Sequence, residues 1–380
     1  MQNQMKQTNS RLESLDILRG FDLFCLVAAG NVLHSLRQAI DTPWYDSLLW
    51  GFSHVEWEGF SPWDLVMPLF MFMAGVSIPF ALSRYKISTN SSGVYRRIAK
   101  RVVLLWIFGM MCQGNLLGLN PDKIYLYTNT LQAIATGYFI AAMLFLHTRI
   151  KVQIGTAVAL LLIYWGAMQF IGIDGYGNGN FTPDGNLAEW IDRSLLGRFR
   201  DLAIVENGTV VFNGSYRYTW ILSSLNFGVT VLTGLFAGHI LRSEKSKERK
   251  GQMLIGIGIA LTAAGWLWGL QHPVIKKLWT SSMVLVSSGY CFLLMGLFYY
   301  WIDCKGHRKG LAWLKVYGMN SIVAYMLANI INFSCIGNSL FYGLEQYMGD
   351  YYAALITTSN AIIIYAILWM LYKHNIFLKV

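Results

Sequence analysis

The chain has 380 residues, of which 55% are hydrophobic and 13% charged, with a mean hydropathy of +0.42. This composition indicates an integral membrane protein and leaves no soluble catalytic domain large enough to hold a core of its own. The formal net charge is +10, but the cations fall between apolar stretches in a pattern set by membrane orientation, so the basic balance does not predict nucleic-acid binding.

Ten apolar stretches follow one another along the chain, each close to the ~20 residues that cross a bilayer as a helix. They lie at residues 15–35, 60–83, 102–118, 126–147, 152–172, 219–241, 252–271, 279–301, 313–335 and 351–372. We therefore expect an all-α integral membrane fold with about ten transmembrane helices. Residues 1–380 show no internal repeat and are predicted to form a single polytopic domain.

The Lys and Arg residues outside these stretches divide into two sets. Alternate gaps on one face hold 20 cations against 4 carboxylates, whereas the gaps on the other face hold 8 cations against 13 carboxylates. Cationic loops stay in the cytoplasm, so the first face, which includes both termini, is predicted to be cytoplasmic. We expect the protein among the lipids of a bacterial cytoplasmic (inner) membrane, with a homodimer as the commonest assembly to consider.

Two gaps on the predicted outer face are long, residues 36–59 and 173–218, and loops of this length are usually functional or disordered. The glycine-rich run at 172–180 is interpreted as a surface turn, because no strand precedes it and no Lys-Ser/Thr follows it, as a phosphate-binding loop requires. The tryptophans of the first loop, which include Trp57, fit an aromatic belt at the membrane interface or a platform for a sugar ring.

The first apolar stretch carries three charged residues, Asp16, Arg19 and Asp22. A charge in the hydrocarbon region costs at least ~2.5–3.5 kcal/mol on insertion scales, so each of them needs a reason to be there. Asp16 and Arg19 are three residues apart and lie on one helical face. They are interpreted either as a structural ion pair near the cytoplasmic interface or as the polar wall of a cavity that opens inward.

The five cysteines have no metal or redox spacing, so no metal is expected. Their odd number argues against a disulfide framework. Cys112 and Cys335 both fall near the predicted outer face, and whether they pair is left open.

His54 lies on the predicted outer face, in a segment that ends at Asp64 and runs directly into the apolar Leu65–Phe80. Asp64 is expected at the start of that helix, where a carboxylate caps the N-terminus. Placed against an imidazole, it would instead fix the tautomer and raise the basicity of the ring. Asn31 is expected at a similar depth, either as a bridge between helices or as a donor to a developing oxyanion.

This constellation resembles the heparan-α-glucosaminide N-acetyltransferase family over almost the whole membrane domain. The matching stretches follow in order: Arg11-Leu-Glu-Ser-Leu-Asp16-Ile-Leu-Arg19-Gly20, Asn31, His54-x-x-Trp57-x-Gly59-x4-Asp64-Leu-Val-Met-Pro68, Pro273-Val-Ile-Lys-Lys-Leu-Trp279-Thr-Ser-Ser, Asp303, and Gly318-Met-Asn320-Ser-Ile-Val-Ala-Tyr325. In one departure, Ala133 follows Leu131-Gln132 where the family often has Arg.

The resemblance implies an enzyme that takes acetyl from cytoplasmic acetyl-CoA and delivers it across the membrane to the amino group of a glucosamine residue. It matches the active histidine of the family to His54 and the neighbouring polar residue to Asn31, and we expect Asp64 to orient the ring. His54 would act as general base or would itself accept the acetyl group in a ping-pong sequence, and both routes stay open. Trp57, Glu58 and Asn320 are expected to contact the acceptor, an amino sugar or oligosaccharide.

The polyanionic end of acetyl-CoA is expected among the inner cations Arg96, Arg97, Lys100 and Arg101, which otherwise serve only membrane orientation. A sugar transporter, proton-coupled through the buried charges, is the alternative from another functional class, although the sequence shows no two-fold repeat. A membrane O-acyltransferase that acts on a glycan hydroxyl would differ only in its acceptor.

Overall fold

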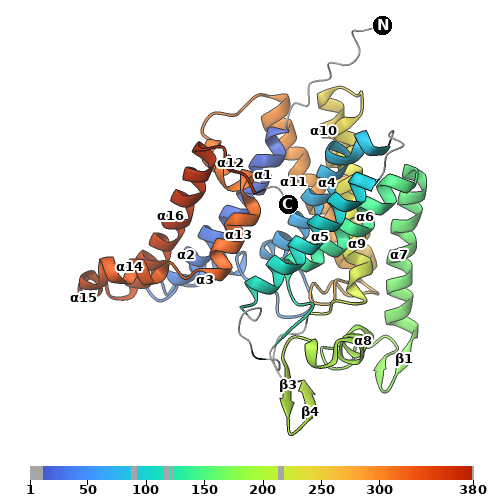
Figure 1. Cartoon of the computed structure of the whole chain (residues 1–380), viewed down its shortest axis with the longest axis horizontal. Helices are drawn as coiled ribbons and strands as arrows, with labels where there is room; N and C mark the ends of the chain where they lie inside the picture. Colours follow the sequence, from blue (N-terminus) through green and yellow to red (C-terminus); the bar gives the residue numbers. More distant parts are fainter. Residues whose placement is uncertain (1–11, 87–91, 115–119, 121–123, 213–217, 379–380) are drawn as a thin grey trace.

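The computed structural model of the chain (Figure 1) describes residues 12–86, 92–114, 120, 124–212 and 218–378. This part of the chain is predominantly helical, with two short β-hairpins. Eight of its helices or continuous helical runs are long and apolar enough to cross a membrane. The predicted all-α integral membrane fold is therefore confirmed.

The eight spans follow the chain. They are α1 (Glu13–Phe24) continued through a π-helical turn (Cys25–Ala29) into α2 (Gly30–Ser35); the 3-10 turn Pro62–Leu65 continued into α4 (Val66–Lys86); α6 (Thr130–His147); α7 (Ile150–Phe170); α9 (Ser223–Arg242); α10 (Lys247–Gly269); α11 (Ser281–Phe298) with the π-helical turn Tyr299–Cys304; and the run from α14 (Ser334–Phe341) through the short helix α15 (Glu345–Met348) to α16 (Tyr352–Lys373).

Two predicted spans take a different form. Helix α5 (Ser92–Cys112) begins ten residues before the expected start at residue 102, because its cations are good helix formers that extend the apolar stretch. The stretch predicted at 313–335 is divided at Asn320, which has φ −123° and ψ 43°, into α12 (Ala312–Met319) and α13 (Ser321–Ile330). Neither α5 nor the α12–α13 pair is among the eight helices or helical runs of the described chain that are long and apolar enough to cross a membrane.

Helix α4 is the centre of the bundle. It packs against α9, α6, α11 and α1, and α5 lies in turn on α6 (Figure 1). The crossing of α4 and α9 is close because Gly75 has no side chain: a methyl group there would lie 2.0 Å from the carbonyl oxygen of Val231. Small residues at such contacts let helix backbones approach within a membrane.

A second close crossing joins α1 to α12. A methyl group on Gly318 would lie 1.8 Å from the carbonyl oxygen of Asp16, and one on Gly20 would lie 1.8 Å from that of Leu314. The crossing therefore needs glycine on both helices. It brings the break at Asn320 beside the charged residues of α1.

At one end of the bundle, gaps that the charge pattern assigned to a single face meet one another. Lys86 donates to the carbonyl oxygen of Thr148 (3.1 Å), and Lys247 donates to that of Asp303 (3.1 Å). Arg308 pairs with Glu13 at 2.9 Å. We call this end, where α4 ends and α10 begins, the basic end; it lies at the top of Figure 1.

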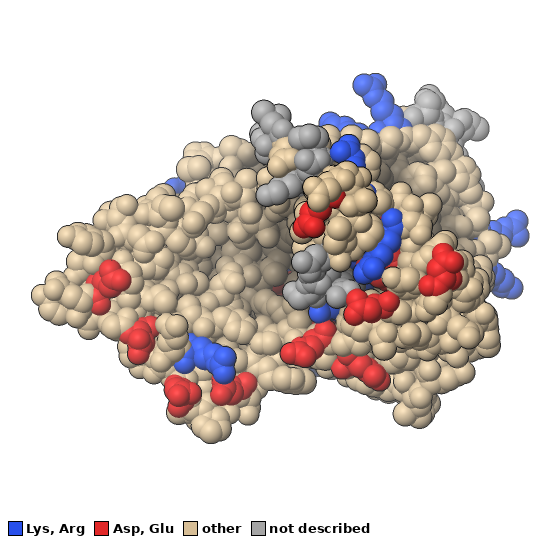
Figure 2. Space-filling view, turned by 90° about the horizontal axis from the view of Figure 1, so that it is seen from below, with Lys and Arg blue, Asp and Glu red and all other residues tan. Residues whose placement is uncertain are grey.

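The opposite end carries the two β-hairpins and two short helices. It holds α3 (Pro43–Trp50), the hairpin of β1 (Gly172–Ile173) and β2 (Tyr176–Gly177), α8 (Leu187–Leu196), and the hairpin of β3 (Ala203–Glu206) and β4 (Thr209–Phe212). Figure 2 shows carboxylates gathered on this face around a hollow. We call it the acidic end.

The described part of the predicted 173–218 loop is folded and anchored. The buried carboxylate of Asp192 on α8 accepts the backbone N–H groups of Trp220 (2.7 Å) and Ile221 (2.9 Å) just before α9. Arg200 pairs with Glu189 of the same helix. All five cysteines are free, which answers the question left open for Cys112 and Cys335.

Candidate functional site

Asp64 caps a helix start and also contacts the imidazole of His54. Its Oδ2 accepts the backbone N–H and the hydroxyl of Ser61, both at 3.0 Å, and so caps the helical run that continues into α4. Its Oδ1 lies 2.7 Å from Nδ1 of His54. Asp64 is 1% exposed, whereas the side chain of His54 is 48% exposed. The carboxylate is therefore buried by the helix start, and the imidazole projects from it.

Lys276 completes this cluster from a distant part of the sequence. Its Nζ lies 3.1 Å from Nδ1 of His54 and 3.4 Å from Oδ1 of Asp64. The two segments are joined by backbone contacts, since Gly59 donates to the carbonyl oxygen of Val274 (2.8 Å) beside the bridge of Glu58 and Ile275. Burial lowers the pKa of Lys276 to about 8, against the opposing attraction of Asp64.

Lys276 is not among the site residues predicted from the sequence. It is one of the cations of the predicted outer face and lies in one of the stretches that carry the family resemblance. The available signal was a pair of lysines, Lys276 and Lys277, between apolar neighbours in a short connection between two spans. Nothing in that signal says which lysine turns inward. In the structure Lys276 is buried and Lys277 is half-buried.

Asn31 lies near this cluster without bonding to it. Its amide donates to the carbonyl oxygens of Leu26 and Val27 in its own helical run, both at 3.4 Å. Gly30, the preceding residue, lies against the indole of Trp63, so α2 adjoins the start of the α4 run. Asn31 is exposed at this place. The predicted oxyanion donor is thus a neighbour of the helix start, with its amide turned back along its own helix.

The residues predicted to contact the acceptor separate into two regions. The indole Nε1 of Trp57 donates to the carbonyl oxygen of Phe181 (2.9 Å), which ties this tryptophan to the 173–218 segment. Glu58 is exposed next to it. Asn320 is buried at the C-terminal end of α12. Its amide donates to the carbonyl oxygen of Ile376 (2.9 Å) and its Oδ1 accepts the N–H of Leu378 (3.2 Å).

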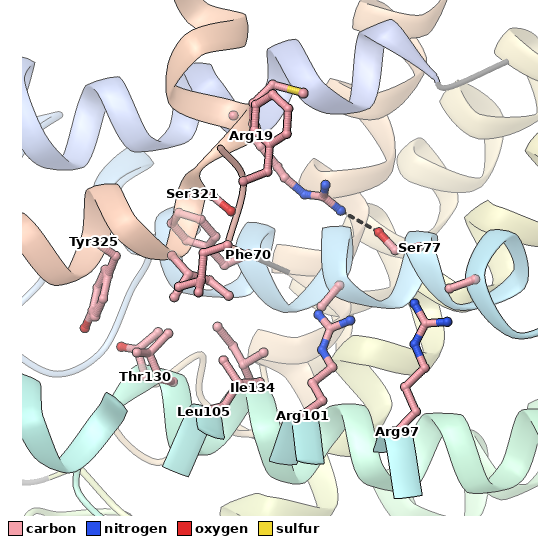
Figure 3. A pocket seen from close by; sticks show the side chains of 18 residues that line it. Arg19, Phe70, Ser77, Arg97, Arg101, Leu105, Thr130, Ile134, Ser321 and Tyr325 are labelled. Carbon is pink, nitrogen blue, oxygen red and sulfur yellow. Dashed lines mark hydrogen bonds between the residues drawn. The ribbon is translucent and has the colours of Figure 1, made fainter. Parts of the chain in front are cut away.

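A cavity of about 480 Å³ lies along α4 (Figure 3). It is lined by residues of α1, α4, α5, α6, α12 and α13 and by the C-terminal tail: Arg19, Phe70, Ala74, Ser77, Ala81, Arg97, Arg101, Leu105, Thr130, Leu131, Ile134, Gly318, Met319, Ser321, Ile322, Tyr325, Phe377 and Leu378. From Phe70 to Ala81 the wall runs about 16 Å along α4, at ~1.5 Å per residue. The cavity is therefore elongated, with mostly apolar walls.

Three arginines converge on this cavity from two helices. Figure 3 shows Arg97 and Arg101 rising from α5 and Arg19 reaching across from α1 to Ser77. Arg19 also donates to the carbonyl oxygen of Met73 (3.3 Å) and lies 3.8 Å from Asp16, so this arginine both pairs with Asp16 and lines the cavity. The guanidinium of Arg101 lies over the ring of Tyr138 at 4.2 Å.

The four cations predicted to bind the donor do not act as one group. Arg97 and Arg101 line the cavity, whereas Arg96 and Lys100 are not among its lining residues; of the four, only Arg101 is not exposed. The Nε of Arg101 is buried and has no hydrogen-bond partner in the described chain. A buried donor without an acceptor is costly, so this atom suits an anionic ligand.

The cavity and the His54 cluster lie at different levels of α4. Thr130, at the far end of the cavity, contacts the sulfur of Met67 (3.6 Å), and Met67 is one helical turn from Asp64. Neither His54 nor Asp64 lines the cavity. Along α4, a layer formed by Met67 and Thr130 therefore lies between Asp64 and the cavity. In the described residues no group of three or more His, Cys, Asp or Glu side chains is placed to hold a metal ion.

The chain is similar to one family model and to two curated proteins. Residues 11–176 match a family model described as Domain of unknown function (DUF5009). Heparan-α-glucosaminide N-acetyltransferase of Homo sapiens is 27% identical over 365 aligned positions, and the match covers 83% of this chain and 52% of that protein. The Mus musculus protein of the same name is 25% identical over 368 residues, 84% and 54% respectively.

The chain spans about half the length of the curated relatives it matches. Both of these relatives carry the same name, and the aligned part covers most of the membrane bundle described above. Over most of its length, this helical membrane chain is similar in sequence to the heparan-α-glucosaminide N-acetyltransferases of two mammals.

Proposed function

We propose that the chain transfers an acetyl group from acetyl-CoA, bound from the basic end, to the amino group of a glucosamine-type sugar at the acidic end. The observation that carries this proposal is the His54–Asp64 pair at the head of α4, with its 2.7 Å contact and half-exposed imidazole. The names of the relatives support acetyl transfer to a glucosaminide as the reaction class.

The donor fits the arginine-lined cavity. Arg97 and Arg101 would pair with phosphate groups of CoA, since guanidinium groups bind phosphate through charge-assisted hydrogen bonds. The elongated apolar wall from Ala81 to Phe70 would accept the pantetheine arm and carry the thioester toward Thr130. The basic end would then face the cytoplasm, where cationic segments stay and where acetyl-CoA is available. That orientation suits a bacterial inner membrane.

At the acidic end, the Nδ1–H of His54 donates to Asp64 and leaves Nε2 with a lone pair. In the direct route, Nε2 takes a proton from the acceptor amine as its nitrogen attacks the thioester carbonyl carbon. The C–N bond forms, the C–S bond breaks, and the departing CoA thiolate takes the proton back from the imidazolium. The products are the N-acetylated sugar and CoA thiol, and His54 returns to its starting state.

In the second route, Nε2 of His54 attacks the thioester carbonyl carbon itself. An acetyl-imidazole forms, and CoA leaves as the thiolate and takes up a proton from water. The amine then attacks the acetyl carbon, displaces the imidazole and releases its own proton to water. This route does not require both substrates to be present at once. Both routes need the thioester to pass the Met67–Thr130 layer, so a small displacement of these side chains is part of the proposal.

The test is acetyl transfer by the purified chain in oriented vesicles. Acetyl-CoA labelled in the acetyl group is supplied on one side, and a panel of saccharides ending in glucosamine on the other. Label on the sugar nitrogen, found by mass analysis and only when acetyl-CoA faces the basic end, is the expected result. Label on a hydroxyl would instead identify an O-acyltransferase, and sugar uptake without acetyl-CoA would identify a transporter.

A further inference from the structure

Lys276 is a buried cation for which the mechanism above has no role. It is 7% exposed, and its Nζ lies 3.1 Å from Nδ1 of His54 and 3.4 Å from Oδ1 of Asp64. Its backbone is held firmly: Ile275 donates to the hydroxyl of Thr280 (3.1 Å) and bridges to Glu58. A flexible lysine that ends in such a place needs a reason, because burying its charge costs free energy.

The distances assign the protons of this cluster. A contact of 2.7 Å between an imidazole nitrogen and a carboxylate oxygen requires a proton between them, so Nδ1–H of His54 donates to Asp64. Nδ1 then has no lone pair for a second donor. The ammonium of Lys276 must direct its own N–H toward Oδ1 of Asp64. One carboxylate oxygen therefore serves two donors, and a positive charge stands 3.1 Å from the ring.

The two neighbours act on His54 in opposite directions. The Asp64 carboxylate favours the imidazolium form, whereas a like charge at hydrogen-bond distance disfavours it. More distant groups surround them: Lys277 lies over the Trp57 ring at 5.9 Å, Tyr218 lies near enough to Asp64 to feel its charge, and Glu56 and Glu58 are exposed on the segment of His54. His34 on α2 bonds to the carbonyl oxygen of Phe52.

Lys276 keeps its charge over the pH range that matters for an imidazole. Burial lowers its pKa to about 8, and Asp64 limits the fall. At pH 7 and below the lysine is therefore mostly protonated, and this range includes the value of ~6.5 at which an unperturbed imidazole takes up its proton. The cation is present throughout the range in which the ring would otherwise become charged.

We propose that Lys276 is a positioning residue that offsets the charge of Asp64, so that Asp64 fixes the tautomer of His54 without converting it to imidazolium. This inference rests on the proposed function only in taking His54 as the reacting group. It applies equally to the direct and the ping-pong route, because each needs a neutral imidazole with a lone pair on Nε2.

The experiment compares pH profiles of kcat/KM, from pH 6 to about 9.5 (a range chosen to bracket the imidazole and Lys276 titrations), for the full-length wild type, Lys276→Met, Lys276→Arg and Lys277→Met. Lys276→Met is expected to move the acid limb upward by about one pH unit or more. Activity would then fall by up to about tenfold on the acid side of the limb, the limit that a one-unit shift sets, and would recover near pH 9. Lys276→Arg, which keeps the charge, is expected to leave the limb in place, as is Lys277→Met. An equal loss at every pH would overturn the inference, because it would assign Lys276 a structural role alone.

A second readout does not depend on acetyl transfer. Diethyl pyrocarbonate modifies neutral imidazoles, so the pH midpoint for labelling of His54, with His54→Ala as background, reports its protonation in each variant. An upward move of the midpoint in Lys276→Met supports the inference, and an unmoved midpoint overturns it. Wild-type turnover by His54→Ala would instead remove the proposed catalytic role of His54, while the labelling midpoint would still decide the role of Lys276.

Discussion

The two polar regions of α4 are built on opposite plans. Around the cavity, Arg19, Arg97 and Arg101 bring charges of one sign together, and the buried Nε of Arg101 has no acceptor in the described chain. At the head of α4, Asp64 and Lys276 carry opposite charges, and the carboxylate of Asp64 bonds to both His54 and Lys276. The first arrangement is incomplete without an anion. The second is complete and leaves one imidazole nitrogen free.

This difference shows how one helix can support both polyanion binding and proton transfer. Binding a polyanion requires unbalanced positive charge, which would keep a nearby imidazole from accepting protons. Proton transfer requires a balanced group whose one reactive atom has a defined state. About nine ångströms of helix separate Asp64 from Phe70 at the end of the cavity, at ~1.5 Å per residue, and Met67 stands between. The separation lets each region keep its own electrostatics.

The largest effect is expected when the imidazole of His54 is removed. We expect His54→Ala to lower acetyl transfer by on the order of 10³-fold or more, while acetyl-CoA affinity at the cavity stays close to that of the wild type. The measurement is turnover with labelled acetyl-CoA beside equilibrium binding of CoA. His34→Ala is the matched control, since His34 is another histidine of the acidic end. Its Nε2 lies within hydrogen-bond distance of the carbonyl oxygen of Phe52 and of the hydroxyl of Ser53. Equal losses of turnover and CoA affinity would mean that the two regions are not separate.

The second-largest effect is expected when the carboxylate of Asp64 loses its charge. Asp64→Asn can present an amide N–H to His54 and so favour the wrong tautomer, and we expect a fall in kcat on the order of 10²-fold. The caps to Ser61 can persist through the amide oxygen, so the thermal midpoint should change little. Asp46→Asn removes an exposed carboxylate paired with Arg37 and serves as control. Unchanged kcat in Asp64→Asn would reduce Asp64 to a helix cap.

The cavity is tested through its arginines. Arg97→Met and Arg101→Met should each raise the KM for acetyl-CoA about tenfold, equivalent to ~1.4 kcal/mol, with a smaller effect on kcat. Arg96→Met and Lys100→Met are the controls, because these side chains are exposed and outside the cavity. If all four substitutions weaken binding equally, the cations act through the field of the basic end and not through the cavity.

The smallest effect is expected at the C-terminal tail. Asn320→Ala removes the two hydrogen bonds that hold Ile376 and Leu378, and we expect a loss of about 1–2 kcal/mol in stability with a change in KM of only a few-fold. Thermal unfolding in detergent and the KM for acetyl-CoA measure the two quantities. Asn329→Ala, whose amide bonds within its own helix, is the control. A large rise in KM would make the tail a working part of the cavity wall.

Parts of the site could be predicted because they are local. His54 and Asp64 are ten residues apart at the start of an apolar stretch, and a carboxylate at such a start caps the helix. Arg97 and Arg101 lie one helical turn apart, so they share a face of α5. Asn31 and Trp57 show the limit of such reasoning. Both lie at the acidic end, but Asn31 bonds within its own helical run and Trp57 is tied to Phe181.

The sequence alone determined the class of the molecule: the apolar stretches, their lengths and the distribution of cations specify a helical membrane protein, because the cost of placing polar groups in hydrocarbon is summed residue by residue. Only the tertiary structure decided which charged side chains meet. Lys276 reaches a histidine 222 positions away, and Arg19 joins Arg97 and Arg101 across helices. Such contacts depend on how closely helices cross, as at Gly75 and Gly318, and that geometry arises from the packing of the whole bundle.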